Sequence, residues 1–196
     1  KKNKKYNHLL RVAVNNKFIS FSLRKRIKSK SKFIVKLIDY KRKEPEFKNL
    51  KYKKILKYLS KVDSSSSDIF LCVNKKILES ATSNILFIKK NKIFSPVKNF
   101  YKGITLKFFE KEVGKIIKKN IFINNLNNYD EIILIGSGRG VVSVESIKTP
   151  KWKRKSLKKY RFLSKIYNHA VTKCPLYNSW SIIPIILKIF LRPKNQ

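Results

Sequence analysis

The fold of this chain is decided by the stretch Glu79-Ser-Ala-Thr-Ser-Asn-Ile-Leu-Phe-Ile88, which a Lys-Lys-Asn-Lys turn joins to Ile93-Phe-Ser-Pro96. Small polar residues lead into an apolar strand, a short turn and a returning strand that ends at proline. The alternation of Ile85, Phe87 and then Ile93 predicts strands with one buried face. Residues 90–92 are the predicted hairpin loop, although they lack an Asn-Gly pair. Glu79 is either a surface residue before an ordinary hairpin or a carboxylate placed beside a ligand.

The flanking sequence predicts further strands and helices by the same periodicities. Thr105 is the predicted N-cap of the second of three helices, because a hydroxyl there precedes an apolar helical face. The predicted strands cover residues 9–14, 17–22, 33–38, 69–73, 121–123, 131–135 and 141–144, and the predicted helices cover residues 51–62, 105–117 and 156–171.

Positive charge is concentrated at the two ends of the chain. The sequence has 48 Lys and Arg against 11 Asp and Glu, a net charge of +37 over 196 residues. Residues 1–61 contribute a net +19 and residues 148–196 a net +13, whereas the 86 residues between them contribute only +5. Self-repulsion of this size predicts a polyanionic partner, with nucleic acid favoured over an anionic membrane surface.

Cysteine usage and hydropathy predict a reduced compartment and no membrane span. Cys72 and Cys174 have no metal-ligand spacing and are predicted to be structural thiols. The longest apolar run, residues 180–191, contains Pro184 and Lys188 and is too short to cross a bilayer. Trp152 and Trp180 are interpreted as packing anchors, with stacking on a nucleic-acid base as the alternative.

A glycine-rich turn, Gly136-Ser-Gly-Arg-Gly140, separates two predicted strands. Such a turn with a hydroxyl is either a structural tight turn or a cradle of backbone N–H groups for an anion. It is not a Walker loop, since no Gly-Lys-Ser/Thr follows it.

Four segments, in this order, resemble the class IV aminotransferases, the fold-type IV pyridoxal-phosphate enzymes that include branched-chain aminotransferases and aminodeoxychorismate lyase. They are Pro45-Glu-Phe-Lys-Asn-Leu-Lys-Tyr52, the Glu-Ser-Ala-Thr-Ser-Asn-Ile-Leu-Phe stretch at 79–87, Lys102-Gly-Ile-Thr105, and Tyr129 to Val144. The resemblance covers residues 33–170. It implies an α+β fold in which a barrel-like mixed sheet is flanked by helices. A basic N-terminal extension (1–32, with possible strands) precedes this domain, and a basic and apolar tail (171–196) follows it.

The resemblance also implies roles for individual residues. Lys48 would condense with the aldehyde of pyridoxal phosphate, and Glu79 would face the pyridine nitrogen and keep it protonated. The backbone N–H groups of Ile104 and Thr105, at a helix start, would hold the phosphate with help from the hydroxyl of Ser137. The family has a further N-terminal domain that supplies one wall of the active site and a phosphate-binding arginine. The sequence leaves no room for that domain, and Lys51 stands where the family usually has Asn.

Two functional hypotheses follow. The first is a degenerate aminotransferase-like domain, a pseudoenzyme without cofactor, that acts as a structural RNA-binding component of a mitochondrial ribosome. Its partners would be ribosomal RNA and neighbouring ribosomal proteins. No targeting segment is visible in the sequence. Its RNA contacts would be Lys1, Lys2, Lys4, Lys5, Arg24, Lys25, Arg26, Lys28, Lys30, Lys151, Lys153, Arg154, Lys155, Lys158, Lys159 and Arg161. The alternative is an active pyridoxal-phosphate-dependent aminotransferase or aminodeoxychorismate lyase, possible as a dimer, whose N-terminal domain is missing or lies on another chain. A basic peripheral membrane protein that uses residues 180–191 is a third interpretation.

Overall fold

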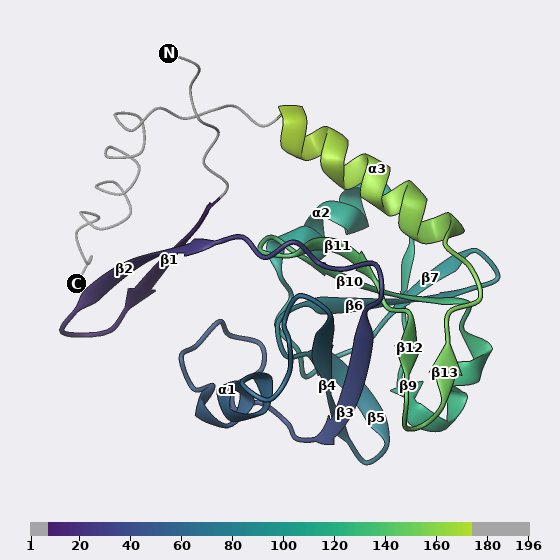
Figure 1. Ribbon diagram of the computed structural model, residues 1–196, viewed down its shortest axis with the longest axis horizontal. Helices are drawn as coiled ribbons and strands as arrows, with labels where there is room; N and C mark the ends of the chain where they lie inside the picture. The colour runs from purple at the N-terminus through teal and green to yellow at the C-terminus, as the bar shows by residue number, and fades with distance from the viewer. Residues whose placement is uncertain (1–7, 174–196) are drawn as a thin grey trace, which may run out of the picture.

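The computed structural model describes residues 8–173, which form two stacked sheets with helices on both outer faces (Figure 1). The five-stranded sheet has the order β11-β10-β6-β7-β8, and the six-stranded sheet the order β13-β12-β3-β4-β5-β9. The strands of the first sheet are β6 (Asn84–Lys89), β7 (Lys92–Ser95), β8 (Ile116–Lys118), β10 (Glu131–Gly136) and β11 (Gly140–Ser143). Those of the second are β3 (Ile34–Asp39), β4 (Ser67–Val73), β5 (Lys76–Ser80), β9 (Ile121–Phe122), β12 (Ser146–Ile147) and β13 (Trp152–Lys153).

Both sheets are mixed. The pairs β3–β4, β3–β12 and β7–β8 are parallel, and the other pairs in the two sheets are antiparallel. This mixed architecture with few helices confirms the predicted α+β fold class with a barrel-like sheet.

The main hydrophobic core lies between the two sheets. Phe70 and Ile77 of the six-stranded sheet pack in one cluster with Ile85, Phe87 and Leu134 of the five-stranded sheet. Trp152 belongs to this cluster as well, and its indole N–H donates to the carbonyl of Tyr129 at 3.1 Å, so it is a packing anchor as predicted. Trp180 and Cys174 lie outside the described residues.

Strand β6 is buried on both faces, unlike the one-faced strand that the alternation predicted. Leu86 and Ile88 point away from the core between the sheets and pack in a second cluster beneath the helices. Ile93 pairs with Ile88 and belongs to that second cluster, so its assignment to the face of Ile85 and Phe87 was wrong. A continuous apolar run is typical of a strand between two layers, and only the second layer distinguishes it from a one-sided strand.

The β6–β7 connection is a two-residue turn formed by Lys90 and Asn91, which have φ values of 47° and 63°. Positive φ at both central positions is the geometry of a type I′ turn, whose twist matches that of the flanking strands. The hairpin was therefore predicted, but its loop is one residue shorter than expected because Lys92 already pairs with Lys89.

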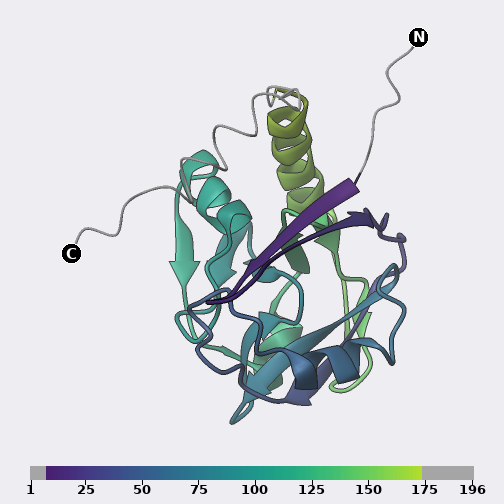
Figure 2. The same cartoon turned by 90° about the vertical axis from the view of Figure 1, so that its left-hand side faces the viewer.

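Three α-helices cover the sheets. Helix α1 (Lys53–Leu59) packs Ile55 against Ile69 and Leu71 on the outer face of the six-stranded sheet. Helices α2 (Ile104–Glu112) and α3 (Lys158–Lys173) lie side by side over the five-stranded sheet (Figure 2), where Phe109 of α2 and Tyr167 of α3 have ring centroids 6.4 Å apart. A short 3₁₀ helix, η1 (Ile123–Asn128), follows β9.

The helix starts differ from the prediction in one respect. Thr105 is not an N-cap: Gly103 holds that position in α2, and Thr105 is a buried residue of the first turn. The start of α3 is held instead by the buried carboxylate of Glu131, which accepts the backbone N–H groups of Lys159 and Tyr160, both at 2.8 Å. A carboxylate at a helix N-terminus both satisfies free donors and complements the helix dipole.

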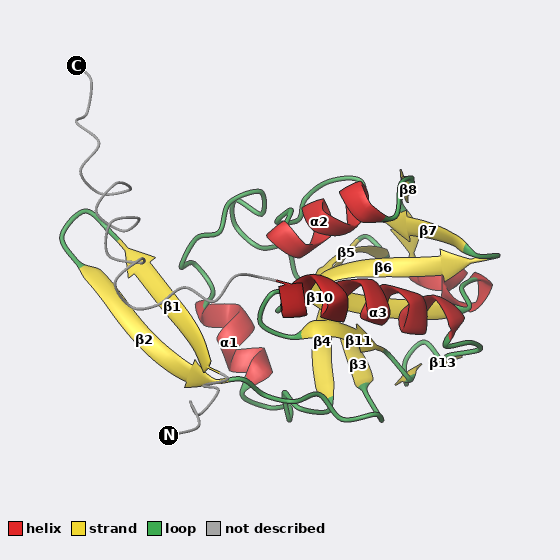
Figure 3. Cartoon of the chain, turned by 90° about the horizontal axis from the view of Figure 1, so that it is seen from above, coloured by secondary structure: helices red, strands yellow, loops and turns green. Residues whose placement is uncertain are grey.

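Strands β1 (His8–Val14) and β2 (Ile19–Lys25) form a separate ribbon that stands off to one side of the body (Figure 3). The predicted strands are present there, with the second shifted toward the C-terminus. One face of the ribbon is apolar apart from the His8–Lys25 pair at its end. Its apolar side chains are 43 to 71% exposed: Leu10, Val12, Val14, Ile19, Phe21 and Leu23. None of the helices in residues 8–173 combines the length and apolar character that crossing a membrane requires.

Candidate functional site

The small polar residues of the opening stretch gather around the fully buried carboxylate of Asp68 in β4. Its Oδ2 accepts the hydroxyls of Ser80 and Thr82, each at 2.6 Å, and its Oδ1 accepts the backbone N–H of Ile69. The guanidinium of Arg139 lies 3.9 Å from the same Oδ2. This network fixes the end of β5, which carries Glu79, against β4.

Glu79 is buried and forms an ion pair with Arg42. Its Oε1 accepts from Nε of Arg42 at 2.9 Å, and its Oε2 accepts from Nη2 of Arg42 at 3.2 Å. The backbone N–H of Tyr101 donates to the same Oε2, also at 3.2 Å. Both partners of the ion pair have 6% of their surface exposed. A carboxylate accepts about four hydrogen bonds, so one acceptor position on Oε1 stays open.

The electrostatics of Glu79 reflect two opposing effects. The pKa of the Glu79 carboxyl is raised above its ordinary value, because burial, with a smaller effect from the charge of Glu46, outweighs the charge and hydrogen bonds of Arg42 and the N–H of Tyr101. The three hydrogen bonds to the carboxylate all come from N–H donors, two on Arg42 and one on Tyr101, and an arginine does not give up its proton in proteins. Protonation of Glu79 would leave a buried guanidinium unpaired, so the arrangement is that of an ionised carboxylate.

Arg42 also connects Glu79 to the segment that carries Lys48. Its Nη1 donates to the carbonyl of Phe47 at 3.0 Å, and its Nη2 donates to the carbonyl of Pro45. Lys48 follows Phe47 directly and is exposed in this chain, whereas the predicted role calls for an amine that is desolvated and neutral. The structure thus brings the predicted Lys48 segment and the predicted Glu79 to one place, through an arginine that the prediction did not include.

The start of helix α2 is pinned to the same place by Asn84. The side-chain amide of Asn84 donates to the carbonyl of Tyr101 at 2.6 Å and accepts the N–H of Gly103 at 3.0 Å. A Cβ at Gly103 would come within 2.9 Å of the Asn84 oxygen, so only glycine fits there without displacement. Within residues 8–173, no hydrogen bond from the backbone N–H of Ile104 or Thr105 is found. These are the two donors that the resemblance assigns to a phosphate group.

Ser137 lies exposed in the β10–β11 turn beside the opening stretch. A Cβ on the preceding Gly136 would lie 3.4 Å from the hydroxyl oxygen of Ser83. Arg139, from the same turn, donates to the Thr82 hydroxyl at 3.3 Å and to the carbonyl of Ser64 at 2.8 Å. The segments that carry Lys48, Glu79, Ile104, Thr105 and Ser137 therefore converge, although they are spread over 90 residues of sequence.

Sequence reasoning missed Arg42 and Asp68. A signal for Arg42 exists, because only eight of the 48 basic residues are arginines. In so lysine-rich a chain, a retained arginine indicates a geometry that lysine does not supply, such as the two-point contact with a carboxylate. Asp68 closes a serine-rich loop in the sequence and carries no comparable signal.

Seven of the residues predicted to contact RNA line two adjoining hollows: Arg26, Lys28, Lys30, Arg154, Lys155, Lys158 and Arg161. Lys1, Lys2, Lys4 and Lys5 lie outside the described residues. Several of the others bind within the chain: Lys30 pairs with Asp63 at 3.1 Å, Arg154 donates to the Ser143 hydroxyl, and Lys155 donates to the carbonyl of Asn127.

The comparisons with known proteins agree with this geometry. The sequence profile of the family described as amino-transferase class IV matches residues 3–147, and the chain belongs to this family. No curated protein sequence gives a significant match to the chain.

Solved structures share the fold at low sequence identity. A branched-chain aminotransferase from Thermoproteus uzoniensis, solved with norvaline, matches with a TM-score of 0.63 and 14% identity over 76% of this chain and 55% of its own. An aminotransferase from Brucella abortus bound to its cofactor PLP matches with a TM-score of 0.59 and 20% identity, over 77% of this chain and 60% of its own. A protein described as a putative 4-amino-4-deoxychorismate lyase, from Legionella pneumophila, matches with a TM-score of 0.61 and 15% identity, over 74% of this chain and 59% of its own. The chain therefore spans 55 to 60% of the length of these three proteins.

These comparisons correct the first functional hypothesis. A ribosomal, mitochondrial or RNA-binding protein is contradicted, because the matching family and the similar structures are enzymes. The error came from treating the net charge as diagnostic. Lysines on solvated faces raise the charge of any fold, and an abundance of Lys and Asn is also what an AT-rich coding sequence produces.

The residues of the site fit pyridoxal phosphate. An ionised carboxylate with an open acceptor position suits a protonated ring nitrogen, and two backbone N–H groups without a partner in the described part of the chain suit a phosphate. An exposed lysine lies on the segment that Arg42 fastens to that carboxylate.

Proposed function

We propose that this chain is the cofactor-binding domain of a pyridoxal-phosphate-dependent enzyme that acts on an amine substrate, as an aminotransferase or an aminodeoxychorismate lyase. The observation that carries the proposal is the Glu79 carboxylate. It is buried, held ionised by Arg42, and adjacent through Tyr101 to a helix start whose first N–H groups have no partner in residues 8–173.

Each residue has a defined task in this proposal. Glu79 keeps a proton on the ring nitrogen, because an ionised carboxylate in a buried place strongly favours the charged form of its partner. Ile104 and Thr105 bind the phosphate through their N–H groups, and Ser137 adds a hydroxyl donor. Lys48 would hold the cofactor at its aldehyde group, and its amine would move a proton at the substrate carbon. When bound, the cofactor supplies an electron sink that weakens bonds to the carbon that carries the substrate amine.

The remaining wall of the active site would come from outside this chain's residues. The similar structures are longer, since the chain spans 55 to 60% of them. The domain that completes the site would lie on a longer form of the protein, on another chain, or on a second subunit of a dimer. The substrate is recognised largely by that wall, and for this reason the proposal names a substrate class and no single substrate.

A titration with pyridoxal phosphate and with pyridoxal tests the proposal. We expect the purified protein to bind one equivalent of pyridoxal phosphate with a new absorbance band, and to bind pyridoxal more weakly because the α2 start has no phosphate to hold. Glu79→Gln should weaken binding and shift the band. Lys51→Ala, an exposed neighbour that pairs with Glu44, is the matched control and should behave as the parent.

Two results would refute the proposal. One is a folded protein that develops no saturable band with the phosphorylated cofactor. The other is a band of equal strength with pyridoxal and pyridoxal phosphate that Glu79→Gln leaves unchanged, since this would indicate condensation with surface lysines in general.

A further inference from the structure

A second polar feature lies away from the Arg42–Glu79 pair. It is a hollow of about 770 Å³ between the segment 26–31, strand β11 and helix α3, hereafter the basic hollow. The segment that follows β2 runs past β11 on its way to β3, with α3 beyond it (Figure 1). Strand β11 and α3 approach closely here, because a Cβ on Gly140 would lie 3.4 Å from the ring of Tyr167. None of Lys48, Glu79, Ile104, Thr105 and Ser137 lines the hollow.

The wall of the basic hollow carries positive charge only. Arg26, Lys28, Lys30, Arg139 and Arg154 line it, and among the described residues that line it none is acidic. Two of the five are partly neutralised: Lys30 pairs with Asp63, and Arg139 lies 3.9 Å from Asp68. Arg26, Lys28 and Arg154 have no carboxylate partner in residues 8–173.

Unpaired polar atoms are concentrated in the same hollow. In the described part of the chain, three buried side-chain nitrogen or oxygen atoms have no hydrogen-bond partner: Nε of Arg26, Oγ of Ser29 and Oγ of Ser164. All three residues line the basic hollow. Buried polar atoms are nearly always paired, so three orphans around one space indicate a polar guest. A guanidinium and two hydroxyls are donors that suit an oxyanion.

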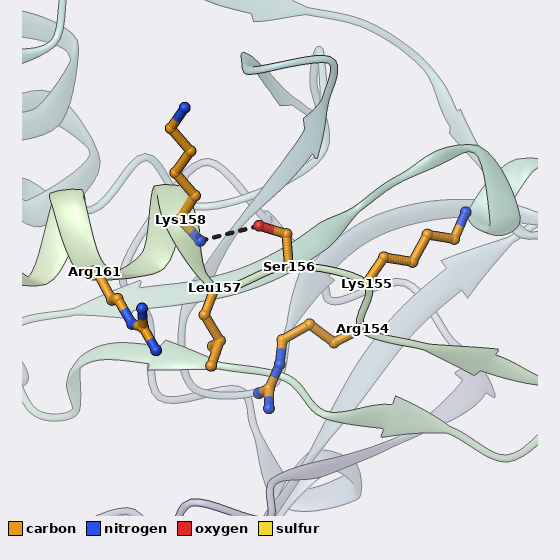
Figure 4. A pocket seen from close by; sticks show the side chains of 6 residues that line it. All are labelled: Arg154, Lys155, Ser156, Leu157, Lys158 and Arg161. Atoms are coloured by element: carbon orange, nitrogen blue, oxygen red, sulfur yellow. Dashed lines mark hydrogen bonds between the residues drawn. The ribbon is translucent and has the colours of Figure 1, made fainter.

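An adjoining hollow extends the same chemistry. It shares Arg154 and Leu157 with the basic hollow and adds Lys155, Ser156, Lys158 and Arg161. Arg154, Leu157 and Arg161 point to one side of the chain, whereas Lys158 points away (Figure 4). Tyr160 and Tyr167, on the same face of α3 as Ser164, and Val141 of β11 also line the basic hollow. The space thus offers donors for an oxyanion with aromatic and aliphatic side chains beside them.

We propose that the basic hollow binds a small organic anion, a carboxylate or phosphate group joined to an apolar, planar body. Arg26 and the hydroxyls of Ser29 and Ser164 bind the oxyanion, Arg154 balances its charge, and Tyr160 and Tyr167 contact the body. The site does not depend on the proposed cofactor chemistry, because it uses none of the residues to which that chemistry is assigned.

Calorimetric titrations with phenyl phosphate and with benzoate test this site and distinguish its two oxyanion sources. We expect at least one of the two to bind with a stoichiometry of one at constant ionic strength. Arg26→Gln should weaken that binding about tenfold, as expected for loss of a charge-assisted hydrogen bond. Lys165→Gln removes the same charge from an exposed position on α3 outside the hollow, and should change the affinity less than twofold.

Ser164→Ala separates a binding role from a structural role. The variant removes an unpaired buried hydroxyl, so the anion-free protein should melt at the same temperature as the parent or higher. Its affinity for the anion should nevertheless fall. The proposal is overturned if neither probe binds stoichiometrically, or if Lys165→Gln weakens binding as much as Arg26→Gln does. A Ser164→Ala variant that is less stable and binds with unchanged affinity also overturns it.

Discussion

At the scale of single residues, the Arg42–Glu79 pair determines the site. One guanidinium contacts a carboxylate and two carbonyl groups of the segment before Lys48, so it joins two parts of the chain 37 residues apart. A buried ion pair of this kind adds little to stability relative to apolar residues, but its rupture is costly because one charge stays buried. We interpret the pair as a means of keeping Glu79 ionised and in place.

Replacement of Arg42 tests this interpretation. Arg42→Met should lower the free energy of unfolding by about 3–5 kcal/mol, because Glu79 is left buried without its countercharge. The double variant Arg42→Met/Glu79→Leu should recover most of that loss. Urea denaturation followed by circular dichroism measures the free energy of unfolding of both variants. A double variant as unstable as the single one would show that packing of the arginine stem, and not the charge pair, is what matters.

The Cys72 thiol provides a second test at this scale. Burial among core residues of β4 raises the pKa of this thiol to about 12, with a smaller effect from Asp39. Only the thiolate reacts with alkylating agents. In a Cys174→Ser background, iodoacetamide at pH 8 should therefore leave Cys72 unmodified in the native protein and modify it in denaturant, as mass spectrometry would report. Rapid labelling under native conditions would place Cys72 outside a closed core.

At the scale of elements, Glu110 ties helix α2 to both of its neighbours. Its carboxylate pairs with Lys102, before the helix, and with Lys118 of β8, each at 2.6 Å. Burial by itself would raise the pKa of Glu110, but the hydrogen bonds and charges of the two lysines outweigh it and lower the pKa below its ordinary value. The pairing holds the loop that positions the α2 start.

The pH dependence of stability follows from that shift. A carboxyl whose pKa is lowered by folding binds fewer protons in the native state, so its contribution is present above the ordinary value of 4.5 and is lost as the pH falls through the lowered one. Thermal melts should show the parent more stable than Glu110→Gln at pH 7, with the difference shrinking below about pH 4.5. A difference that is constant from pH 7 to pH 3 would contradict the assignment.

Periodicity predicted most of the elements, and the misses have physical causes. Strands β3, β4 and β10 are apolar runs, and α3 has its tyrosines and leucine on one face, so local sequence was sufficient for them. The role of Thr105 was misassigned because the helix begins earlier than predicted. Gly103, whose N–H is bound by the Asn84 side chain of β6, is the N-cap of α2. The second face of β6 is buried by α2 and α3, and these helices are too far away in the sequence to affect the local hydrophobic pattern of the strand.

The candidate site shows the same division between local and distant information. Lys48, Glu79 and the α2 start were predicted as site residues because each lies in a short motif with a recognisable order. Arg42 and Asp68 were missed because their meaning depends on partners 37 and 12 residues away, which only the folded chain brings together.

At the scale of the whole molecule, two sheets with helices on both outer faces accommodate the many basic residues of 8–173 with little burial of their charge. The only basic residue among the buried ones in the described part of the chain is Arg42, and it is paired. Lysines elsewhere stay hydrated, so the charge excess concerns solubility and encounters with anions rather than the fold. This separation explains how a family enzyme fold and a strongly basic composition coexist in one sequence.

We propose that Lys48 is the residue that holds pyridoxal phosphate. Its most direct test is borohydride reduction of the protein with one equivalent of the cofactor, followed by peptide mapping of the modified lysine. We predict that the reduced cofactor is found mainly on Lys48, that Glu79→Gln lowers this yield, and that Lys51→Ala does not. A label spread over the 40 lysines without preference for Lys48, and equal in the Glu79→Gln variant, would show that Lys48 is not the cofactor lysine.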